Sequence, residues 1–74
     1  MAQLNYNQAV RAMENRQAFK GNTLWAQWEN GEYCVYSYRT LMLRENAEGV
    51  WFNETKYSVT TSKHQNYIRR AFNL

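Results

Sequence analysis

One pair of residues in this chain could support nucleophilic catalysis, because Cys34 is the only cysteine and His64 the only histidine. Cys34 lies in a run of aromatic and β-branched residues, where a cysteine ordinarily fills a core as a small apolar side chain. His64 falls on the helix stripe that is predicted to face a sheet, which favours a structural imidazole over a ligand or a switch. We therefore expect no enzymatic activity and no catalytic residue.

The sequence lacks the residues that common metal and cofactor sites require. One cysteine and one histidine cannot form a Cys/His zinc cluster, and a chain without aspartate cannot form an EF-hand loop. The sequence contains no glycine-rich phosphate-binding loop. Carboxylate pairs such as Glu45 and Glu48 fall in a predicted turn, where solvated surface charge explains them. The sequence therefore predicts neither a metal site nor a cofactor.

Basic and aromatic residues of the last predicted helix form one candidate contact surface. Lys63, Tyr67 and Arg70 recur at helical spacing, and Arg69 is adjacent to them. Such a surface could contact a partner protein or a nucleic acid. The alternative is an ordinary solvated face, on which Arg69 and Arg70 stabilise the C-terminal end of the helix dipole.

Aromatic residues of the predicted strands form a second candidate surface. Trp25, Tyr36 and Tyr38 fall on one face of a predicted sheet. On an uncovered face, these rings could stack the bases of a single-stranded nucleic acid or act as a hot spot for a protein partner. On a covered face, the same rings would fill the core.

The elements that position these residues begin with a helix over residues 5–17. Asn5 is a suitable N-cap, and Gln8 follows at the spacing of a capping box. Apolar residues recur at helical spacing as Tyr6, Ala9, Val10, Ala12 and Met13. Gly21 then breaks the pattern.

A β-hairpin follows, because Asn30-Gly31 is a strong two-residue turn signal between runs of aromatic and β-branched residues. This turn pairs Glu29 with Glu32, Trp28 with Tyr33, Ala26 with Val35, and Trp25 with Tyr36. One face then carries Leu24, Ala26, Trp28, Tyr33 and Val35, and the other carries Trp25, Gln27, Cys34, Tyr36 and Tyr38. Both faces are apolar enough that either could face the core.

Two further strands are predicted over residues 40–44 and 50–53. A tight turn at Tyr38-Arg39 and a polar turn at residues 45–49 precede them, and an extended piece at residues 56–59 follows. Short turns between neighbouring strands favour an antiparallel meander.

The last helix is predicted to begin with a capping box from Ser62 to Gln65. Hydroxyls and free amides would converge there, which makes Thr61 and Ser62 a candidate anion-binding site. It would suit a phosphate of a nucleic acid or a carboxylate of an acidic partner protein. The stripe that should pack on the sheet consists of His64, Ile68, Ala71 and Phe72. The predicted fold is therefore α+β, with an N-terminal helix, a four-stranded antiparallel meander and a C-terminal helix packed on the sheet.

Length and charge limit what such a fold can do. Residues 1–74 are expected to form one small domain, which must draw stability from its aromatic residues or from self-association as a homodimer. No apolar segment is long enough to span a membrane, the N-terminus does not resemble a signal peptide, and one unpaired thiol fits a reducing compartment. The net charge of +3 is a mild basic bias that leaves nucleic acid open as a partner.

Two motifs of the chain resemble a known family. The first is Tyr36-Ser37-Tyr38-Arg39-Thr40, and the second is Tyr-Ser-x-Thr-Thr-Ser-Lys-His-Gln at residues 57–65, followed by Arg69-Arg70. These motifs, within residues 19–72, are similar to a family of small uncharacterised bacteriophage proteins with a Tyr-Ser-Tyr-x-Thr strand. Many relatives have glycine where this chain has Arg39, so the tight turn departs from their pattern there. The resemblance implies a phage origin and brings no activity with it.

We therefore expect a small phage-type protein of the host cytoplasm that binds and inhibits a host or defence protein through exposed aromatic and basic residues. The step from phage origin to inhibition follows what small early phage proteins commonly do. The alternative is a nucleic-acid-binding module that combines the basic last helix with the aromatic residues of the sheet. A structural or homo-oligomeric accessory protein is a third alternative. Binding of DNA or RNA that weakens steeply with salt would favour the second hypothesis over the first.

Overall fold

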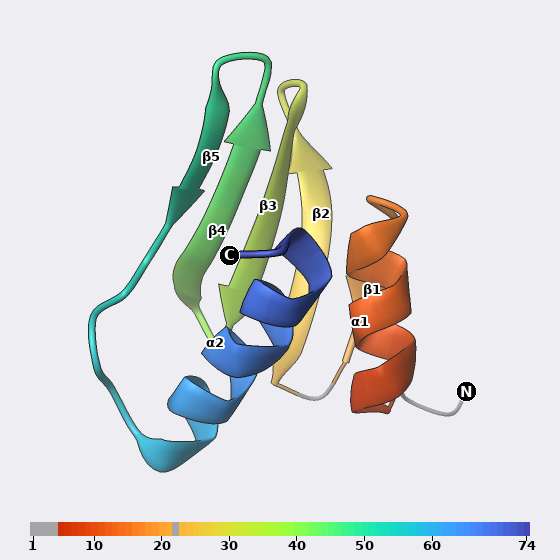
Figure 1. Cartoon of the computed structure of the whole chain (residues 1–74). Helices are drawn as coiled ribbons and strands as arrows, with labels where there is room; N and C mark the ends of the chain where they lie inside the picture. The colour runs from red at the N-terminus through yellow and green to blue at the C-terminus, as the bar shows by residue number, and fades with distance from the viewer. Residues whose placement is uncertain (1–4, 22) are drawn as a thin grey trace.

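Five antiparallel strands in the order β1-β2-β3-β4-β5 form the sheet of the protein (Figure 1). The computed structural model describes residues 5–21 and 23–74. The elements are α1 (Tyr6–Glu14), β1 (Phe19–Lys20), β2 (Leu24–Glu29), β3 (Glu32–Ser37), β4 (Thr40–Asn46), β5 (Gly49–Phe52) and α2 (Val59–Phe72). The α+β class and the antiparallel meander are confirmed, and the sheet has one strand more than the four predicted.

The additional strand is β1, which pairs Phe19 with Ala26 and Lys20 with Trp25. It has two residues, too few to show an alternation of apolar and polar side chains in the sequence. Gly21 then allows the close turn into β2, where its N–H donates to the Leu24 carbonyl at 2.9 Å. A Cβ at Gly21 would lie 2.5 Å from that oxygen, so a side chain there would displace the turn.

The hairpin of β2 and β3 has the predicted register in all four pairs, including Trp25 with Tyr36. Asn30 and Gly31 both have positive φ angles, 53° and 82°, as the two central residues of a type I′ turn require. The second tight turn lies at Tyr38-Arg39 as predicted, and Tyr38 has a φ of 57°. Arg39 therefore does not prevent the turn.

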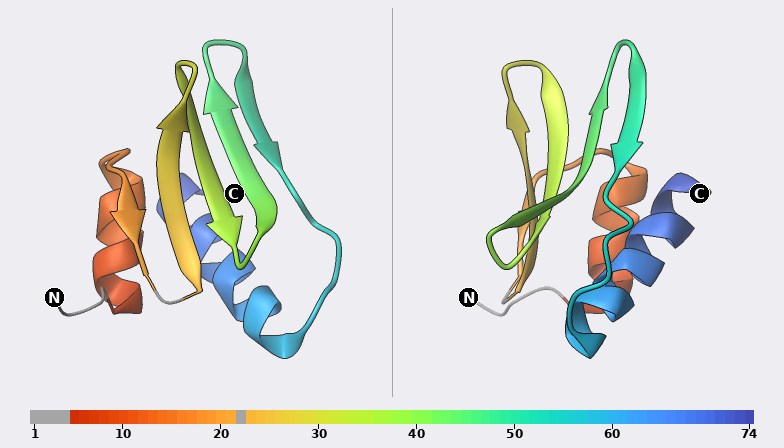
Figure 2. Two further views of the ribbon diagram at one scale, coloured as in Figure 1. Left: turned by 180° about the vertical axis from the view of Figure 1, so that it is seen from behind. Right: turned by 90° about the vertical axis from the view of Figure 1, so that its left-hand side faces the viewer.

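Both helices cover the same face of the sheet, and the opposite face is left uncovered (Figure 2). The buried residues of the covered face include Leu24, Ala26, Tyr33, Val35 and Leu43. The helices add Val10, Met13, His64 and Ile68. The structure thus decides which face of the hairpin is the core. Trp28 is the exception on that face: it is 53% exposed, and its Nε1 donates to the Arg16 carbonyl at 3.0 Å.

Helix α1 begins as predicted and ends earlier than predicted. The Asn5 side chain accepts from the Gln8 amide at 2.8 Å, and the Gln8 side chain accepts from the Asn5 amide at 2.9 Å. The helix ends at Glu14 instead of residue 17, because Arg16 takes a left-handed conformation with a φ of 52°. Neither helix in the described ranges is long and apolar enough to cross a membrane.

The predicted start of α2 at Ser62 is wrong, because the helix begins at Val59. Its N-cap is Ser58, whose side chain accepts from the Thr61 amide at 3.2 Å. The side chain of Gln65 does not reach back to a cap and instead donates to the carbonyls of Asn53 and Thr55, at 2.7 and 3.0 Å. The extended piece predicted at residues 56–59 accordingly ends at residue 58 and forms no strand.

Replacing Ser58 with alanine should lower the free energy of unfolding by about 1 kcal/mol, because the cap of α2 is lost. Replacing Ser62 with alanine should change it by less than about 0.5 kcal/mol, since this serine lies inside the helix, where alanine is the better helix former. Urea denaturation of the two variants measures both effects. A larger loss of stability in the Ser62 variant would indicate that Ser62, as predicted from the sequence, caps the helix instead of Ser58.

Candidate functional site

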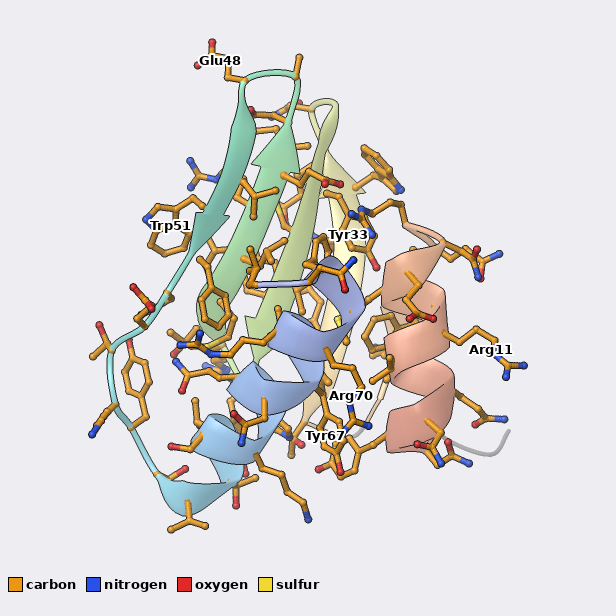
Figure 3. The ribbon with its side chains drawn as sticks, viewed as in Figure 1. Arg11, Tyr33, Glu48, Trp51, Tyr67 and Arg70 are labelled. Carbon is orange, nitrogen blue, oxygen red and sulfur yellow. The ribbon has the colours of Figure 1, made fainter. Side chains whose placement is uncertain are left out.

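Two tyrosines and two cations meet where α1 and α2 lie side by side. The rings of Tyr6 and Tyr67 are stacked, with 4.6 Å between their centres and 16° between their planes. Lys63 Nζ lies 5.6 Å from the centre of the Tyr6 ring, and Arg70 Cζ lies 5.9 Å from that of Tyr67. We call these four residues the helix seam. Figure 3 shows Tyr67 and Arg70 between the two helices, whereas Arg11 points away from the outer side of α1.

The sequence positions the seam through helical spacing and one long-range contact. Lys63, Tyr67 and Arg70 follow each other at four and three residues, so they share one side of α2. Tyr6 comes from the first turn of α1, and its hydroxyl lies 3.1 Å from Nε2 of the buried His64. Sequence reasoning assigned Tyr6 to the core stripe of α1 and missed it as a contact residue. Nothing in the local pattern indicates that its ring meets Tyr67.

The cations of the seam are not neutralised within the described part of the chain. The ion pairs found there join Arg16 to Glu45, Arg44 to Glu32 and Arg69 to Glu54. Lys63 and Arg70 have no carboxylate partner among those residues, and both side chains are exposed. The seam therefore presents two positive charges beside aromatic rings that are held in place by stacking.

Arg69 does not belong to this surface, although the sequence grouped it with Lys63 and Arg70. Its Nη2 lies 3.3 Å from Glu54 Oε1, and its Cζ lies 4.9 Å from the centre of the Phe52 ring. One residue in an α-helix corresponds to a rotation of about 100°. Arg69 is consequently turned from the seam toward the end of β5.

His64 is the centre of a buried polar cluster that connects both helices to the sheet. Its Nδ1 lies 2.7 Å from Ser37 Oγ, and its Nε2 lies 3.1 Å from the Tyr6 hydroxyl and 3.2 Å from Thr23 Oγ1. Burial, followed by the charge of Lys63, lowers the pKa of His64 below its ordinary value of 6.5. The imidazole is therefore neutral at physiological pH, as expected for a structural group.

The start of α2 leaves Thr61 and Ser62 without the free amides that an anion site would need. The Thr61 amide donates to the Ser58 side chain, and the Ser62 amide donates to the Ser58 carbonyl at 3.0 Å. The Thr61 hydroxyl is buried and accepts from Ser58 Oγ at 3.3 Å. The reason for predicting an anion site at these two residues is lost when the helix begins at Val59.

The uncovered face of the sheet carries the other aromatic candidates. Trp25 and Tyr36 are stacked, with 4.1 Å between ring centres and 8° between planes. The Tyr36 hydroxyl donates to Glu29 at 2.6 Å, which raises the pKa of Tyr36 to about 12. Tyr38 does not join them: its ring lies 6.1 Å from the ring of His64, on the helix side, because the left-handed turn interrupts the alternation. Only its carbonyl reaches Trp25, whose Nε1 donates to it at 2.7 Å.

Cys34 and His64 do not form a thiol–imidazole pair. The side chain of Cys34 lies on the uncovered side of the sheet, since its neighbours Tyr33 and Val35 point into the core, while His64 lies on the helix side. Cys34 is nevertheless buried, and burial raises the pKa of its thiol. Within residues 5–21 and 23–74, no three potential metal ligands come together.

No curated protein and no solved structure matches this chain significantly. One family model matches residues 8–73, which extend from the first turns of α1 to the residue after α2. The match therefore includes every strand of the sheet and all of α2, with Lys63, Tyr67 and Arg70. Tyr6 is the one seam residue that precedes the matched range. On this evidence the chain belongs to the family described as "Family of unknown function (DUF8033)".

Proposed function

We propose that this protein is a binding module whose helix seam docks on an acidic surface of a partner protein. The observation that carries the proposal is the pair of cations, Lys63 and Arg70, beside the stacked rings of Tyr6 and Tyr67. Tyrosine and arginine dominate hot spots of protein interfaces, because they combine apolar area with directed polar contacts. Rings that are already stacked lose little side-chain freedom when a partner binds.

The charge of the seam determines which partner it fits. Two exposed cations without a carboxylate partner in the described ranges favour an opposing surface rich in aspartate or glutamate. Each tyrosine has one ring face against the other ring, which leaves less stacking area for a nucleobase. A protein surface therefore suits the seam better than a nucleic acid does.

The phage origin implied by the Tyr-Ser-Tyr-x-Thr and Tyr-Ser-x-Thr-Thr-Ser-Lys-His-Gln motifs extends the proposal to the identity of the partner. A phage protein of this size would act in the host cytoplasm, on a host or defence protein that it inhibits. An acidic surface on such a protein is the expected target.

The nucleic-acid alternative requires two groups of residues that lie on opposite sides of the sheet. It combined the basic last helix with the sheet aromatics. However, Lys63 and Arg70 belong to α2, which covers one face of the sheet (Figure 2), whereas the side chains of Trp25 and Tyr36 alternate onto the other face. One strand of nucleic acid would have to pass around the edge of the sheet to contact both groups. Titration of labelled double-stranded DNA, whose bases are paired and stacked, at two salt concentrations tests phosphate binding by the seam, which we expect to be absent at micromolar protein.

Reversing both seam charges with Lys63→Glu and Arg70→Glu should weaken capture of the partner by about 30-fold or more, the equivalent of a hot-spot loss of about 2 kcal/mol. The measurement is a quantitative pull-down from bacterial host lysate. The matched control is the pair Arg11→Glu and Lys56→Glu, which changes the net charge equally at one exposed arginine and one exposed lysine away from the seam. Equal loss in both pairs would show that net charge matters and the seam does not.

A further inference from the structure

A second surface feature, independent of the seam, is an open pocket of about 670 Å³ where β1 joins β2. Its walls include the side chains of Lys20, Trp25 and Gln27, which alternate onto the uncovered face of the sheet. Phe19 and Ala26, which are buried, also line it. The left view of Figure 2 shows this face, with β1 beside β2 and the helices behind. A volume of this size is typical of sites for small ligands.

One ring face of Trp25 is turned toward this pocket. Lys20, Trp25 and Tyr36 form one cross-strand row, because Lys20 pairs with Trp25 and Trp25 with Tyr36. The ring centres of Trp25 and Tyr36 are 4.1 Å apart, close to the spacing of about 4.8 Å between strands, so the two rings are stacked along this row. Tyr36 therefore covers the face of Trp25 that is turned to β3. The other face is turned to β1, where Lys20 lies.

The polar groups around this ring face suit a planar ligand with an anionic group. Lys20 is exposed and forms no ion pair with a carboxylate of the described residues. The side-chain N–H of Gln27 donates to Glu29 at 2.6 Å, and no described residue donates to the Gln27 side-chain oxygen, which can accept from a ligand. An aromatic face, a cation and an amide acceptor match the ring, the phosphate and the amino group of a nucleotide.

We propose that this pocket binds a nucleobase that extends the stack of Tyr36 and Trp25, with Lys20 on its phosphate. Two sources share this chemistry: a free mononucleotide, and one nucleotide of a single-stranded RNA or DNA. Purines stack over a larger area than pyrimidines, so adenine should bind more tightly than uracil. The proposal requires neither the helix seam nor its partner.

The test is a titration of the whole protein with AMP, adenosine, UMP and a hexamer of riboadenylate. Binding is followed by NMR at the indole N–H of Trp25 and at the backbone amides of Lys20 and Gln27, which remain in the Trp25 and Lys20 variants. AMP should shift this signal, adenosine should bind about threefold more weakly, and UMP more weakly than AMP. Trp25→Leu should weaken AMP binding by about tenfold or more, since stacking on an aromatic residue contributes about 1–3 kcal/mol per base. Lys20→Ala should remove the preference for AMP over adenosine while the fold stays intact.

Trp51→Leu is the matched control, because Trp51 is a tryptophan on the same face of the sheet but lies on β5, away from the pocket. This variant should bind AMP as the wild type does. A hexamer that binds far more tightly than AMP identifies a single strand as the ligand, and equal affinities identify the free nucleotide. The proposal is overturned if millimolar AMP leaves the Trp25 signal unchanged, or if Trp51→Leu and Trp25→Leu weaken binding equally.

Discussion

Replacing His64 with alanine is expected to lower the free energy of unfolding by about 3 kcal/mol. The side chain is completely buried, and its loss leaves a cavity. It also removes the 2.7 Å hydrogen bond of the buried Ser37 Oγ, which keeps only the longer contact with Thr61 Oγ1 at 3.5 Å. A cavity in a core costs about 24 cal/mol per Å³, and the loss of a hydrogen bond costs about 0.5–1.5 kcal/mol. In a domain of this size, where a single core rarely supplies more than about 5 kcal/mol, that is most of the stability.

The same residue should make the stability of the wild type depend on pH. Burial keeps the pKa of His64 below 6.5 in the folded state, so the unfolded chain binds a proton more readily as the pH falls. The stabilisation is therefore complete above about pH 6.5 and decreases below it, by at most about 1.4 kcal/mol per pH unit, until the folded pKa is reached. Urea denaturation at pH 7.5 and at pH 5.5 measures this decrease, since both pH values lie above the pKa of about 4.3 that a glutamate has in a model peptide.

His64→Asn is the informative control, because an asparagine can place a polar atom near the position of Nδ1 and retain a bond to Ser37. It should lose less stability than His64→Ala, and both variants should lose the pH dependence, since His64 is the only histidine. A pH slope that persists in the variants would assign it to other groups. A loss below about 1 kcal/mol in His64→Ala would show that the cluster does not hold the helices on the sheet.

Replacing Arg16 with alanine should lower the free energy of unfolding by about 2 kcal/mol. Its guanidinium binds the Glu45 carboxylate through two N–H groups, with 3.0 Å from Nη2 to Oε2, and Nη1 donates to the Met13 carbonyl at 2.7 Å. Its Cζ also lies 4.0 Å from the centre of the Phe72 ring. The part-exposed ion pair contributes about 1 kcal/mol. The contact with the Phe72 ring and the hydrogen bond to the Met13 carbonyl together contribute about as much again. Arg16 thereby joins the end of α1 to β4 and to the end of α2.

Arg11→Ala is the matched control, since Arg11 is an exposed arginine of α1 that points away from the rest of the protein (Figure 3). It should change stability by less than about 0.5 kcal/mol. Thermal or urea denaturation of Arg16→Ala, Glu45→Ala and the double variant should give a coupling energy of about 1 kcal/mol between the two side chains. If Arg16→Ala is no more destabilising than Arg11→Ala, these contacts do not join the three elements.

The parts of the fold that follow from local signals were predicted correctly. Asn30-Gly31 determines a two-residue turn, and that turn determines the register of β2 and β3. The capping box at Asn5 determines where α1 begins. The stripe of His64, Ile68 and Ala71 is buried on the sheet as its spacing predicted. In each case the interacting residues are close in sequence, so spacing alone carries the information.

The parts that depend on contacts between distant segments were not predictable. The choice of core face follows from where the helices pack, because both faces of the hairpin are apolar. The register of β3 and β4 shifts between Val35 and Tyr36, which leaves Met42 and Leu43 both fully buried, and no alternating pattern predicts consecutive core residues. The sequence did not indicate Ser58 as the cap of α2, because Ser62 and Gln65 have the spacing of a capping box. In the structure the Gln65 side chain instead donates to the carbonyls of Asn53 and Thr55.

The candidate site also contains residues that spacing predicted and residues that it did not. Spacing placed Lys63, Tyr67 and Arg70 on one side of α2, and the structure brings them together. Tyr6 could not be added from sequence, because it lies 61 positions before Tyr67 and meets it only when α1 and α2 pack. Tyr38 left the aromatic face for a conformational reason, since a residue with a positive φ redirects its side chain.

The most direct test of the helix seam is site-specific photocrosslinking inside bacterial cells. A photoreactive phenylalanine analogue replaces Asn66, an exposed residue of α2 that lies three positions after Lys63 and four before Arg70 and so borders the seam. The control position is Glu48, an exposed residue in the turn between β4 and β5, far from the seam (Figure 3). We predict one dominant crosslinked protein from position 66, lost with Lys63→Glu and Arg70→Glu, and none from position 48. Crosslinking from position 48 and not from position 66, or crosslinks at position 66 that survive the charge reversal, would contradict the proposed site.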